Sequence, residues 1–213
     1  MPNLGALREE YLRGGLSREN LNENPIEQFS TWFQQALDAE IAEPNAMTLA
    51  TVDPENRPWQ RTVLLKAYDE HGFVFYTNYE SRKAKHLLTN PHASILFPWV
   101  TLERQVIING IVEKVSTAES LKYFVSRPFS SRLGAWVSQQ SSVISSRSLL
   151  EAKLQELKNK FKDGDVPLPS FWGGYRIKPT DIEFWQGGAG RVHDRFLYSK
   201  ASNGNWEIDR LAP

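Results

Sequence analysis

Two cations at the ends of a strand-like segment are the first residues of this sequence that could do chemistry. Arg61 and Lys66 flank four residues with strand propensity: Thr62, Val63, Leu64 and Leu65. Side chains alternate between the two faces of a strand, so each cation shares its face with apolar neighbours. Burying a cation there is unfavourable unless an anion meets it. The segment therefore indicates either an anion-binding site or an edge strand whose ends are solvated.

A second segment combines hydroxyl groups with cations. Arg82 and Lys83 fall in the first turn of a predicted helix, where cations oppose the helix dipole. The same helix start offers free N–H groups and the hydroxyls of Thr77 and Ser81, which together suit a phosphate. This pattern favours an anion site over a solvated surface.

A third cluster lies near the end of another predicted helix. Tyr123 and Arg127 are four residues apart, so they share a helical face, and Ser131 follows in the next turn. Together they offer a phenol, a guanidinium and a hydroxyl. An equally simple interpretation is an arginine that complements the helix dipole at its C-terminus.

A glycine-rich turn precedes the fourth cluster. Residues 187–190 read Gly-Gly-Ala-Gly, and Arg191, His193 and Arg195 follow at alternating positions of a predicted strand, with Trp185 before the turn. Alternation places the three polar side chains on one face. A lone histidine is usually structural, but two arginines that flank it on one face indicate a binding role.

These clusters hold more cations than one phosphate group requires, and 12% of the residues are aromatic. The combination indicates a phosphorylated planar cofactor beside a small phosphorylated substrate. The chain has no Ser-His-Asp order, paired-acid signature or Walker loop, so hydrolysis and phosphoryl transfer have little support. Chemistry supplied by an organic cofactor fits better, since the protein then needs only to bind, orient and polarise.

The elements that must position these residues are short strands joined mostly by hairpins. Period-two segments predict strands at residues 46–53, 59–68, 73–78, 93–99, 103–115, 171–178, 181–186, 195–200 and 206–209. Helices are predicted after the cap Asn24, over residues 81–89 and 116–127, and from about residue 148 to Phe161. No Gly-x-Gly-x-x-Gly follows a strand, which disfavours a doubly wound α/β fold. The expected class is α+β, mainly antiparallel β, built as an antiparallel barrel with peripheral helices. Residues 1–20 are expected to form a mobile N-terminal arm and residues 21–213 a single domain.

Composition excludes several other classes. Lys plus Arg and Asp plus Glu each total 25, and this zero net charge argues against a nucleic-acid binder. The chain has no cysteine and only four scattered histidines, so no metal site is expected. No apolar run approaches the roughly 20 residues that cross a bilayer, and no secretory signal is visible. We therefore expect no membrane contact and a cytoplasmic location.

Ten ordered motifs resemble the pyridoxine/pyridoxamine 5′-phosphate oxidase family. They lie at residues 61–66, 75–78, 81–83, 96–99, 103–105, 134–138, 167–174, 183–186, 191–195 and 208–213. The resemblance runs from about Leu7 to the end of the chain, and its most specific parts are Arg-Val-His-Asp-Arg at 191–195 and Asp-Arg-Leu-Ala-Pro at 209–213. It implies an FMN-binding split β-barrel that works as a homodimer with FMN at the subunit interface.

The resemblance also implies an activity. The enzyme would oxidise pyridoxine 5′-phosphate or pyridoxamine 5′-phosphate to pyridoxal 5′-phosphate, with hydride transfer to FMN and reoxidation by O2 to give H2O2. The implied cofactor-binding residues are Arg61, Thr62, Val63, Leu64, Leu65, Lys66, Tyr76, Thr77, Arg82, Lys83, Gln105, Gln140, Ser141, Trp185 and Arg195.

The substrate site implied by the resemblance draws on three parts of the chain. Its phosphate would meet Lys66, Tyr123, Arg127 and Ser131. Arg191 and His193 would lie against the pyridine ring as the catalytic residues, and the arm around Arg8 and Tyr11 would close over it. The family's arm usually carries two consecutive arginines, whereas Arg8 is followed here by Glu9.

Three other functions compete with this one. Another split-barrel flavoprotein, such as a flavin reductase or a deazaflavin-dependent reductase, would share the flavin cations but would have no reason to carry Tyr123, Arg127 and Ser131 together. A non-catalytic FMN or pyridoxal-phosphate carrier would bind the ligand without consuming O2. A nucleic-acid-binding barrel is disfavoured by the zero net charge.

Overall fold

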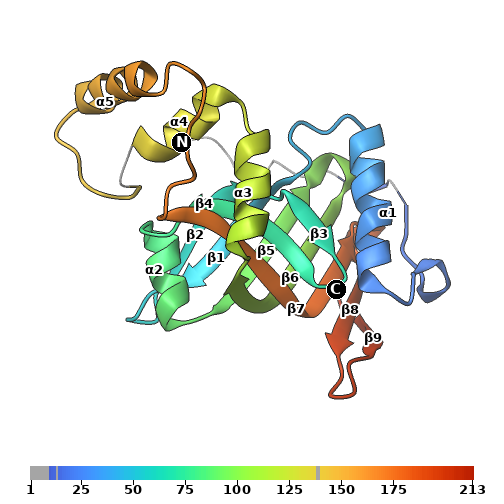
Figure 1. The fold of residues 1–213 in the computed structure, drawn as a ribbon. Coiled ribbons are helices and arrows are strands. Elements are labelled where there is room, and N and C mark those ends of the chain that lie inside the picture. The colour runs from blue at the N-terminus through green and yellow to red at the C-terminus, as the bar shows by residue number, and fades with distance from the viewer. Residues whose placement is uncertain (1–9, 13, 138–139) are drawn as a thin grey trace, which may run out of the picture.

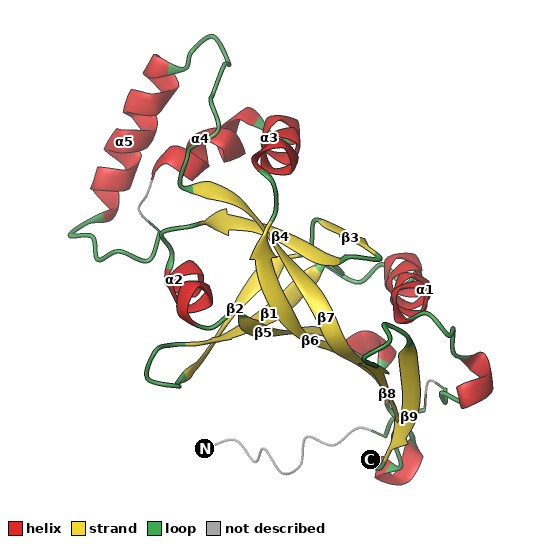
Figure 2. Ribbon diagram, turned by 60° about the horizontal axis from the view of Figure 1, so that its bottom comes forward, coloured by secondary structure: helices red, strands yellow, loops and turns green. Residues whose placement is uncertain are grey.

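A curled antiparallel sheet forms the centre of the molecule (Figures 1 and 2). The computed structural model describes residues 10–12, 14–137 and 140–213. The strands are β1 Ala46–Val52, β2 Pro58–Leu64, β3 Ala67–Asp69, β4 Gly72–Asn78, β5 His92–Trp99, β6 Arg104–Lys114, β7 Trp172–Gln186, β8 Asp194–Lys200 and β9 Trp206–Leu211. The helices are α1 Pro25–Asp38, α2 Arg82–Thr89, α3 Thr117–Ser126, α4 Phe129–Val137 and α5 Arg147–Lys160.

The strands of this sheet follow the order β2-β1-β5-β6-β7-β4-β3, and β8 pairs with both β7 and β9. Every pairing is antiparallel. The predicted class, a mainly antiparallel barrel with peripheral helices, is confirmed. None of the helices in the described part of the chain is long and apolar enough to cross a membrane.

The main core fills the inside of the curled sheet and is closed by α1. Alternate residues of β5 point inward, and Ile95 and Phe97 are fully buried. Phe29 of α1 packs against Phe97 with ring centroids 5.0 Å apart, and Trp32 packs edge-on against Phe184 at 5.2 Å. Side chains of α1 and of the strands therefore fill the interior of the curled sheet. A ligand-binding site has to lie outside this core.

A second, smaller core lies where α3, α4 and α5 gather at one end of the sheet (Figure 1). Its buried members are Phe124, Leu133, Leu157, Val166 and Trp172. The hydroxyl of Ser116 caps α3 by accepting from the Glu119 N–H at 3.1 Å, as the sequence predicted. This core fixes the end of α3 and the start of β7, which both contribute to the site.

Three predicted boundaries were wrong. The strand predicted at residues 59–68 is two strands, because the chain pairs with β1 up to Leu64 and with β4 from Ala67. Residues 172–186 form one strand, not two, because a bulge opposite Asn109 and Gly110 leaves Thr180 without a partner on β6 and accommodates Pro179, which lacks an N–H. The segment after Arg127 was expected to be a turn but forms α4. Pro128 ends α3 and also accepts the first hydrogen bonds of α4, since proline suits a helix start.

Candidate active site

The candidate site is a cavity of about 620 Å³ between β2, β4, α3 and α4. Such a volume suits a cofactor or a small ligand. Its lining includes these predicted site residues: Thr62, Val63, Leu64, Lys66, Tyr76, Thr77, Lys83, Tyr123, Arg127, Ser131 and Gln140. Arg61 and Leu65 are the exceptions in their segment: Arg61 does not line the cavity, and Leu65 is only 4% exposed and belongs to the main core.

One wall of the cavity is a stack of aromatic rings that carries an arginine. The rings of Tyr76 and Tyr123 are 4.0 Å apart, and Trp172 stacks on Tyr76 at 5.4 Å. The Arg127 guanidinium lies 4.7 Å from the Trp172 ring centre. Its Nη1 atom is buried and has no hydrogen-bond partner among the described residues. Because an unpaired buried donor is unfavourable, this atom fits an anionic ligand.

A second cation lies at the other end of the cavity. The Lys83 side chain is 8% exposed, and its Nζ donates to Thr77 Oγ1 at 3.0 Å and to Gln140 Oε1 at 3.1 Å. Burial, with a smaller contribution from nearby Arg61, lowers the pKa of Lys83 to about 8. The ammonium group is therefore surrounded by neutral partners and a like charge, which an anion would stabilise.

Arg61 and Arg82 complete this cation cluster with Lys83. The Arg61 guanidinium donates to the Leu49 carbonyl. Burial lowers the pKa of Arg61, and the nearby charge of Arg82 makes a smaller contribution in the same direction. The Arg82 guanidinium lies 4.4 Å from the Trp59 ring centre. Within the described residues, none of the three cations pairs with a carboxylate. Of the three, Lys83 lines the cavity, as Arg127 does, and Arg61 lies close enough to Lys83 to affect its pKa.

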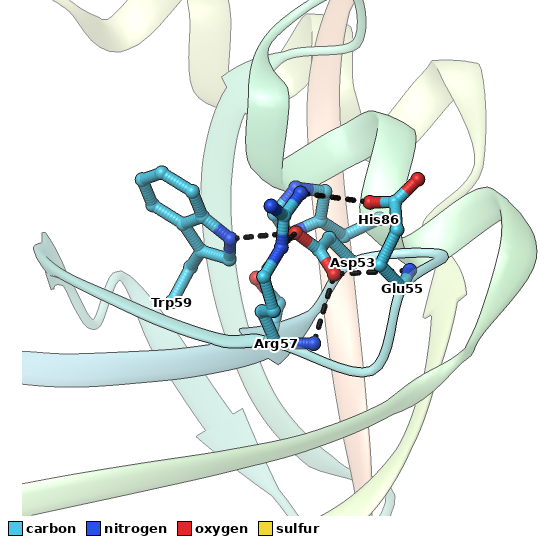
Figure 3. Close-up of polar contacts among 6 residues, drawn as sticks. Asp53, Glu55, Arg57, Trp59 and His86 are labelled. Atoms are coloured by element: carbon cyan, nitrogen blue, oxygen red, sulfur yellow. Dashed lines mark hydrogen bonds and ion pairs between the residues drawn. The ribbon is translucent and has the colours of Figure 1, made fainter.

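Asp53 holds the hairpin between β1 and β2 that carries Trp59. Its carboxylate accepts from the N–H groups of Glu55 and Arg57, from Arg57 Nε and from Trp59 Nε1, and Figure 3 shows these side chains turned toward it. Burial alone would raise the pKa of Asp53, but these hydrogen bonds and the charge of Arg57 lower it to about 2. Asp53 therefore fixes the ring on which Arg82 rests.

We expect Asp53→Asn to lower the thermal midpoint near neutral pH, because an amide cannot accept from four donors. The carboxylate stabilises the fold above its ordinary pKa of 3.8, and this contribution is lost as the pH falls toward about 2. The difference in midpoint between the two proteins should therefore shrink over this interval. Thermal unfolding followed by circular dichroism measures it, and a difference that does not change with pH would contradict the role of the charge.

Other predicted site residues form a second group, near the opposite end of β7 from the cavity. Gln105 of β6, Trp185 of β7 and Arg195 of β8 are direct cross-strand partners, so their side chains share one face. The His193 ring lies 4.8 Å from Trp185. Arg195 is held by a two-point ion pair with Glu183, at 2.8 and 3.1 Å.

Part of the N-terminal arm reaches this second group. The Tyr11 ring lies 5.8 Å from both Trp185 and His193, and it packs so closely on Gly187 that a Cβ there would come within 2.8 Å of the ring. Arg191 is exposed, has a positive φ of 64° and ends a 3-10 turn over Ala189–Arg191. Because β8 begins only at Asp194, the predicted alternation of Arg191, His193 and Arg195 along one strand was wrong. The other predicted arm residue, Arg8, falls outside the described residues.

A single chain does not bring the two groups together. Of the described residues, those that line the cavity include none of the second group. Trp172 and Trp185 occupy opposite ends of β7, separated by 13 residue steps or roughly 40 Å along the strand. Figures 1 and 2 agree that α3, α4 and α5 lie at one end of the sheet and the β8–β9 hairpin at the other.

The sequence analysis missed Trp172 as a site residue, although it lies within the motif at 167–174. In the sequence, Trp172 stands out only as a tryptophan followed by two glycines. The second of these glycines, Gly174, lies close to Tyr76, and a Cβ on Gly174 would come within 2.8 Å of the tyrosine ring. Ser141, which was predicted, accepts from the Arg82 N–H at 3.3 Å and so lies beside the cation cluster.

Comparison with protein families finds two matches along the chain. Residues 33–161 match the family model described as "Pyridoxamine 5'-phosphate oxidase". Residues 172–213 match the model described as "Pyridoxine 5'-phosphate oxidase C-terminal dimerisation region". The boundary between them separates the cavity from most of the second group.

Curated relatives match over the full chain. A "Pyridoxine/pyridoxamine 5'-phosphate oxidase" from Crocosphaera subtropica is 62% identical over 99% of this chain and 100% of that protein. A protein of the same name from Aliarcobacter butzleri is 61% identical, again over 99% of this chain and all of the relative.

Solved structures share the fold. PhzG from Burkholderia lata, in complex with tetrahydrophenazine-1-carboxylic acid, superposes with a TM-score of 0.88 at 28% identity and covers 93% of this chain and 98% of that one. A pyridoxamine 5′-phosphate oxidase-related, FMN-binding protein from Nostoc punctiforme superposes with a TM-score of 0.73 at 16% identity, over 91% of this chain and 100% of that one.

Proposed function

This chain belongs to the pyridoxine/pyridoxamine 5′-phosphate oxidase family, and we propose on that premise which of its residues bind cofactor and substrate. It is an FMN-dependent oxidoreductase that forms a homodimer and converts pyridoxine 5′-phosphate or pyridoxamine 5′-phosphate to pyridoxal 5′-phosphate. When bound, FMN supplies a ring that accepts a hydride from C4′ of the substrate and passes the electrons to O2, yielding H2O2. A cytoplasmic location and a single domain over residues 21–213 stay predictions.

The cation cluster is the proposed site of the FMN phosphate. Lys83, Arg61 and Arg82 lie together without a carboxylate partner among the described residues, which is the environment that a phosphate dianion stabilises. Residues 62–66, Tyr76, Thr77, Gln140 and Ser141 line or adjoin the same cavity and would hold the rest of the cofactor.

The substrate phosphate is proposed to bind Arg127, with Tyr123, Ser131 and Lys66. The observation that carries this proposal is the buried, unpaired Nη1 of Arg127 in the same cavity as Lys83. The phosphate then serves as a remote handle that orients C4′ for hydride transfer. Arg127 is preorganised for this role because its guanidinium already rests on the Trp172 ring.

The second group is proposed to act on the cavity of the partner subunit. Gln105, Trp185 and Arg195 would contact the cofactor there, and Arg191 and His193 would lie against the substrate ring, with Tyr11 and Arg8 closing over it. His193 Nδ1 accepts from the Gly188 N–H at 3.1 Å, so the neutral ring carries its proton on Nε2 and can donate it to the substrate.

The experiment that tests the function is an absorbance spectrum followed by anaerobic addition of pyridoxine 5′-phosphate. We expect a flavin spectrum that bleaches on addition and recovers when O2 is admitted, with H2O2 as a product. A flavin reductase would not be bleached by this substrate. A carrier protein would be yellow and would neither bleach nor consume O2.

Mixed dimers test whether one site draws on two subunits. Arg127→Ala and Arg191→Met should each lower activity at limiting substrate. In a heterodimer of the two variants, one site would carry both substitutions and the other site neither. After random subunit exchange half of the dimers are heterodimers, so about a quarter of all sites should carry neither substitution and be active. Activity that stays at the level of the separate variants after verified exchange would place both residues in one subunit and contradict the shared site.

A further inference from the structure

A buried chain of hydrogen bonds links Arg61 to His86, a residue to which the proposed function assigns no role. Arg61 Nη1 donates to Thr51 Oγ1 at 2.7 Å, and Thr51 Oγ1 lies 3.0 Å from His86 Nδ1. The chain crosses three elements, β2, β1 and α2. Thr51 is 1% exposed and His86 is 5% exposed, so water does not compete for these groups.

The chemistry of the groups fixes the direction of the first hydrogen bond. A guanidinium only donates, so the Thr51 oxygen accepts from Arg61. The hydroxyl keeps one proton and a second lone pair, so its bond to His86 Nδ1 forms with either neutral tautomer of the ring.

The surroundings of His86 keep its ring neutral. Burial lowers the pKa of His86, and the nearby charges of Arg61 and Arg82 lower it further, while Asp53 and Glu55 act in the opposite direction. The centre of the Trp59 ring, which Asp53 fixes, lies 6.2 Å from that of the histidine ring. A neutral imidazole can hydrogen-bond to the Thr51 hydroxyl in either tautomer.

The location of His86 ties Arg61 to the other two cations. Arg82 and Lys83 begin α2, and His86 lies one turn later on the same helix. A hydrogen-bonded chain from His86 through Thr51 therefore fixes the Arg61 guanidinium relative to that helix start. Without the Thr51 hydroxyl, Arg61 would keep only its bond to the Leu49 carbonyl at 3.1 Å.

We propose that Thr51 and His86 are positioning residues that orient Arg61 toward the phosphate of FMN. The inference rests on the proposed function at one point, the binding of the FMN phosphate by the cation cluster. Neither residue lines the cavity, and the hydrogen bond from Arg61 to Thr51 connects both of them to the cation cluster beside it.

The first test compares Thr51→Val, which removes only the hydroxyl, with Thr51→Ser, which keeps it. Titration of the apoprotein, followed by quenching of flavin fluorescence, gives the dissociation constants for FMN and for riboflavin, which lacks the phosphate. We expect Thr51→Val to weaken FMN binding roughly 3- to 10-fold and to leave riboflavin binding unchanged, with Thr51→Ser close to wild type. Thr31→Val, an exposed position on α1, is the matched control.

The histidine gives a second, independent pair of variants. His86→Asn keeps a hydrogen-bonding group near the position of Nδ1, whereas His86→Leu has none. We expect only His86→Leu to weaken FMN binding, which also keeps the proposal testable if Thr51→Val does not fold. Equal losses for FMN and riboflavin would indicate a general structural role and overturn the proposal.

A double-mutant cycle with Arg61→Ala separates this inference from the proposed function. If Thr51 acts through Arg61, adding Thr51→Val to Arg61→Ala should weaken FMN binding no further. Additive losses would overturn the inference alone. An Arg61→Ala protein that binds FMN like wild type would overturn the proposed phosphate site, and this inference with it.

Discussion

Lys83→Met is expected to weaken FMN binding by about 2–5 kcal/mol, or roughly 30- to 5,000-fold in dissociation constant. Methionine preserves the length and apolar volume of the side chain but removes the charge. The lysine is 8% exposed and holds Thr77 and Gln140, so its loss removes a charge-assisted bond and frees two polar neighbours. Titration of the apoprotein with FMN measures the change.

The control for this variant is Lys85→Met, because Lys85 is exposed on the same helix. It should bind FMN like wild type. If Lys83→Met does so too, the ammonium group does not bind the cofactor, and the proposed phosphate site is wrong.

The pH dependence of FMN binding gives an independent test of Lys83. Its pKa in the free protein is lowered to about 8, so the lysine is mostly charged at pH 7 and mostly neutral at pH 9. A phosphate monoester is a dianion throughout this interval, since its second pKa is about 6. FMN affinity should therefore fall as the pH rises through about 8, and this fall should be absent in Lys83→Met.

Local spacing was enough to predict much of the cavity. Tyr123 lies on α3 and Arg127 is the extended C-cap residue directly after this helix, and both line the cavity. Period two placed Thr62, Leu64 and Lys66 on one face, and all three line the cavity. Of the opposite face, Leu65 lies in the core as expected, but Val63 lines the cavity too. These relations act within one element, so the sequence alone contains them.

Contacts between distant elements were not predictable in this way. Trp172 lies beneath Arg127 because α3 and the start of β7 share the smaller core, and no sequence period links the two residues. The pair of Thr51 and His86 was missed for the same reason. A threonine in a strand and a histidine in a short helix are both ordinary until their burial and separation are known.

The second group illustrates a different limit. Gln105, Trp185 and Arg195 lie in one cross-strand row, and that row is a property of sheet register. Under the proposal above, the row would act on the cavity of the partner subunit, which requires the dimer. Sequence motifs suggest these residues, but neither the motifs nor one folded chain brings the row to Arg127.

Arg127→Ala is expected to raise KM for pyridoxine 5′-phosphate by roughly 10- to 150-fold, equivalent to about 1.4–3 kcal/mol, with a smaller effect on kcat. The phosphate does not change during the reaction, so a residue that binds it contributes similarly to the ground state and the transition state. FMN affinity should be unchanged, because the cation cluster at Lys83 remains intact. Steady-state O2 consumption and FMN titration measure the two effects separately.

Two further variants show whether the guanidinium acts by charge or by shape. Arg127→Lys keeps the positive charge but loses the flat group that rests on Trp172 and offers a fork of donors, so it should recover only part of the loss. Lys122→Ala removes an exposed cation from the same helix and should leave KM unchanged. If Arg127→Ala and Lys122→Ala behave alike, the buried Nη1 of Arg127 has another purpose, and the substrate phosphate must bind elsewhere in the cavity.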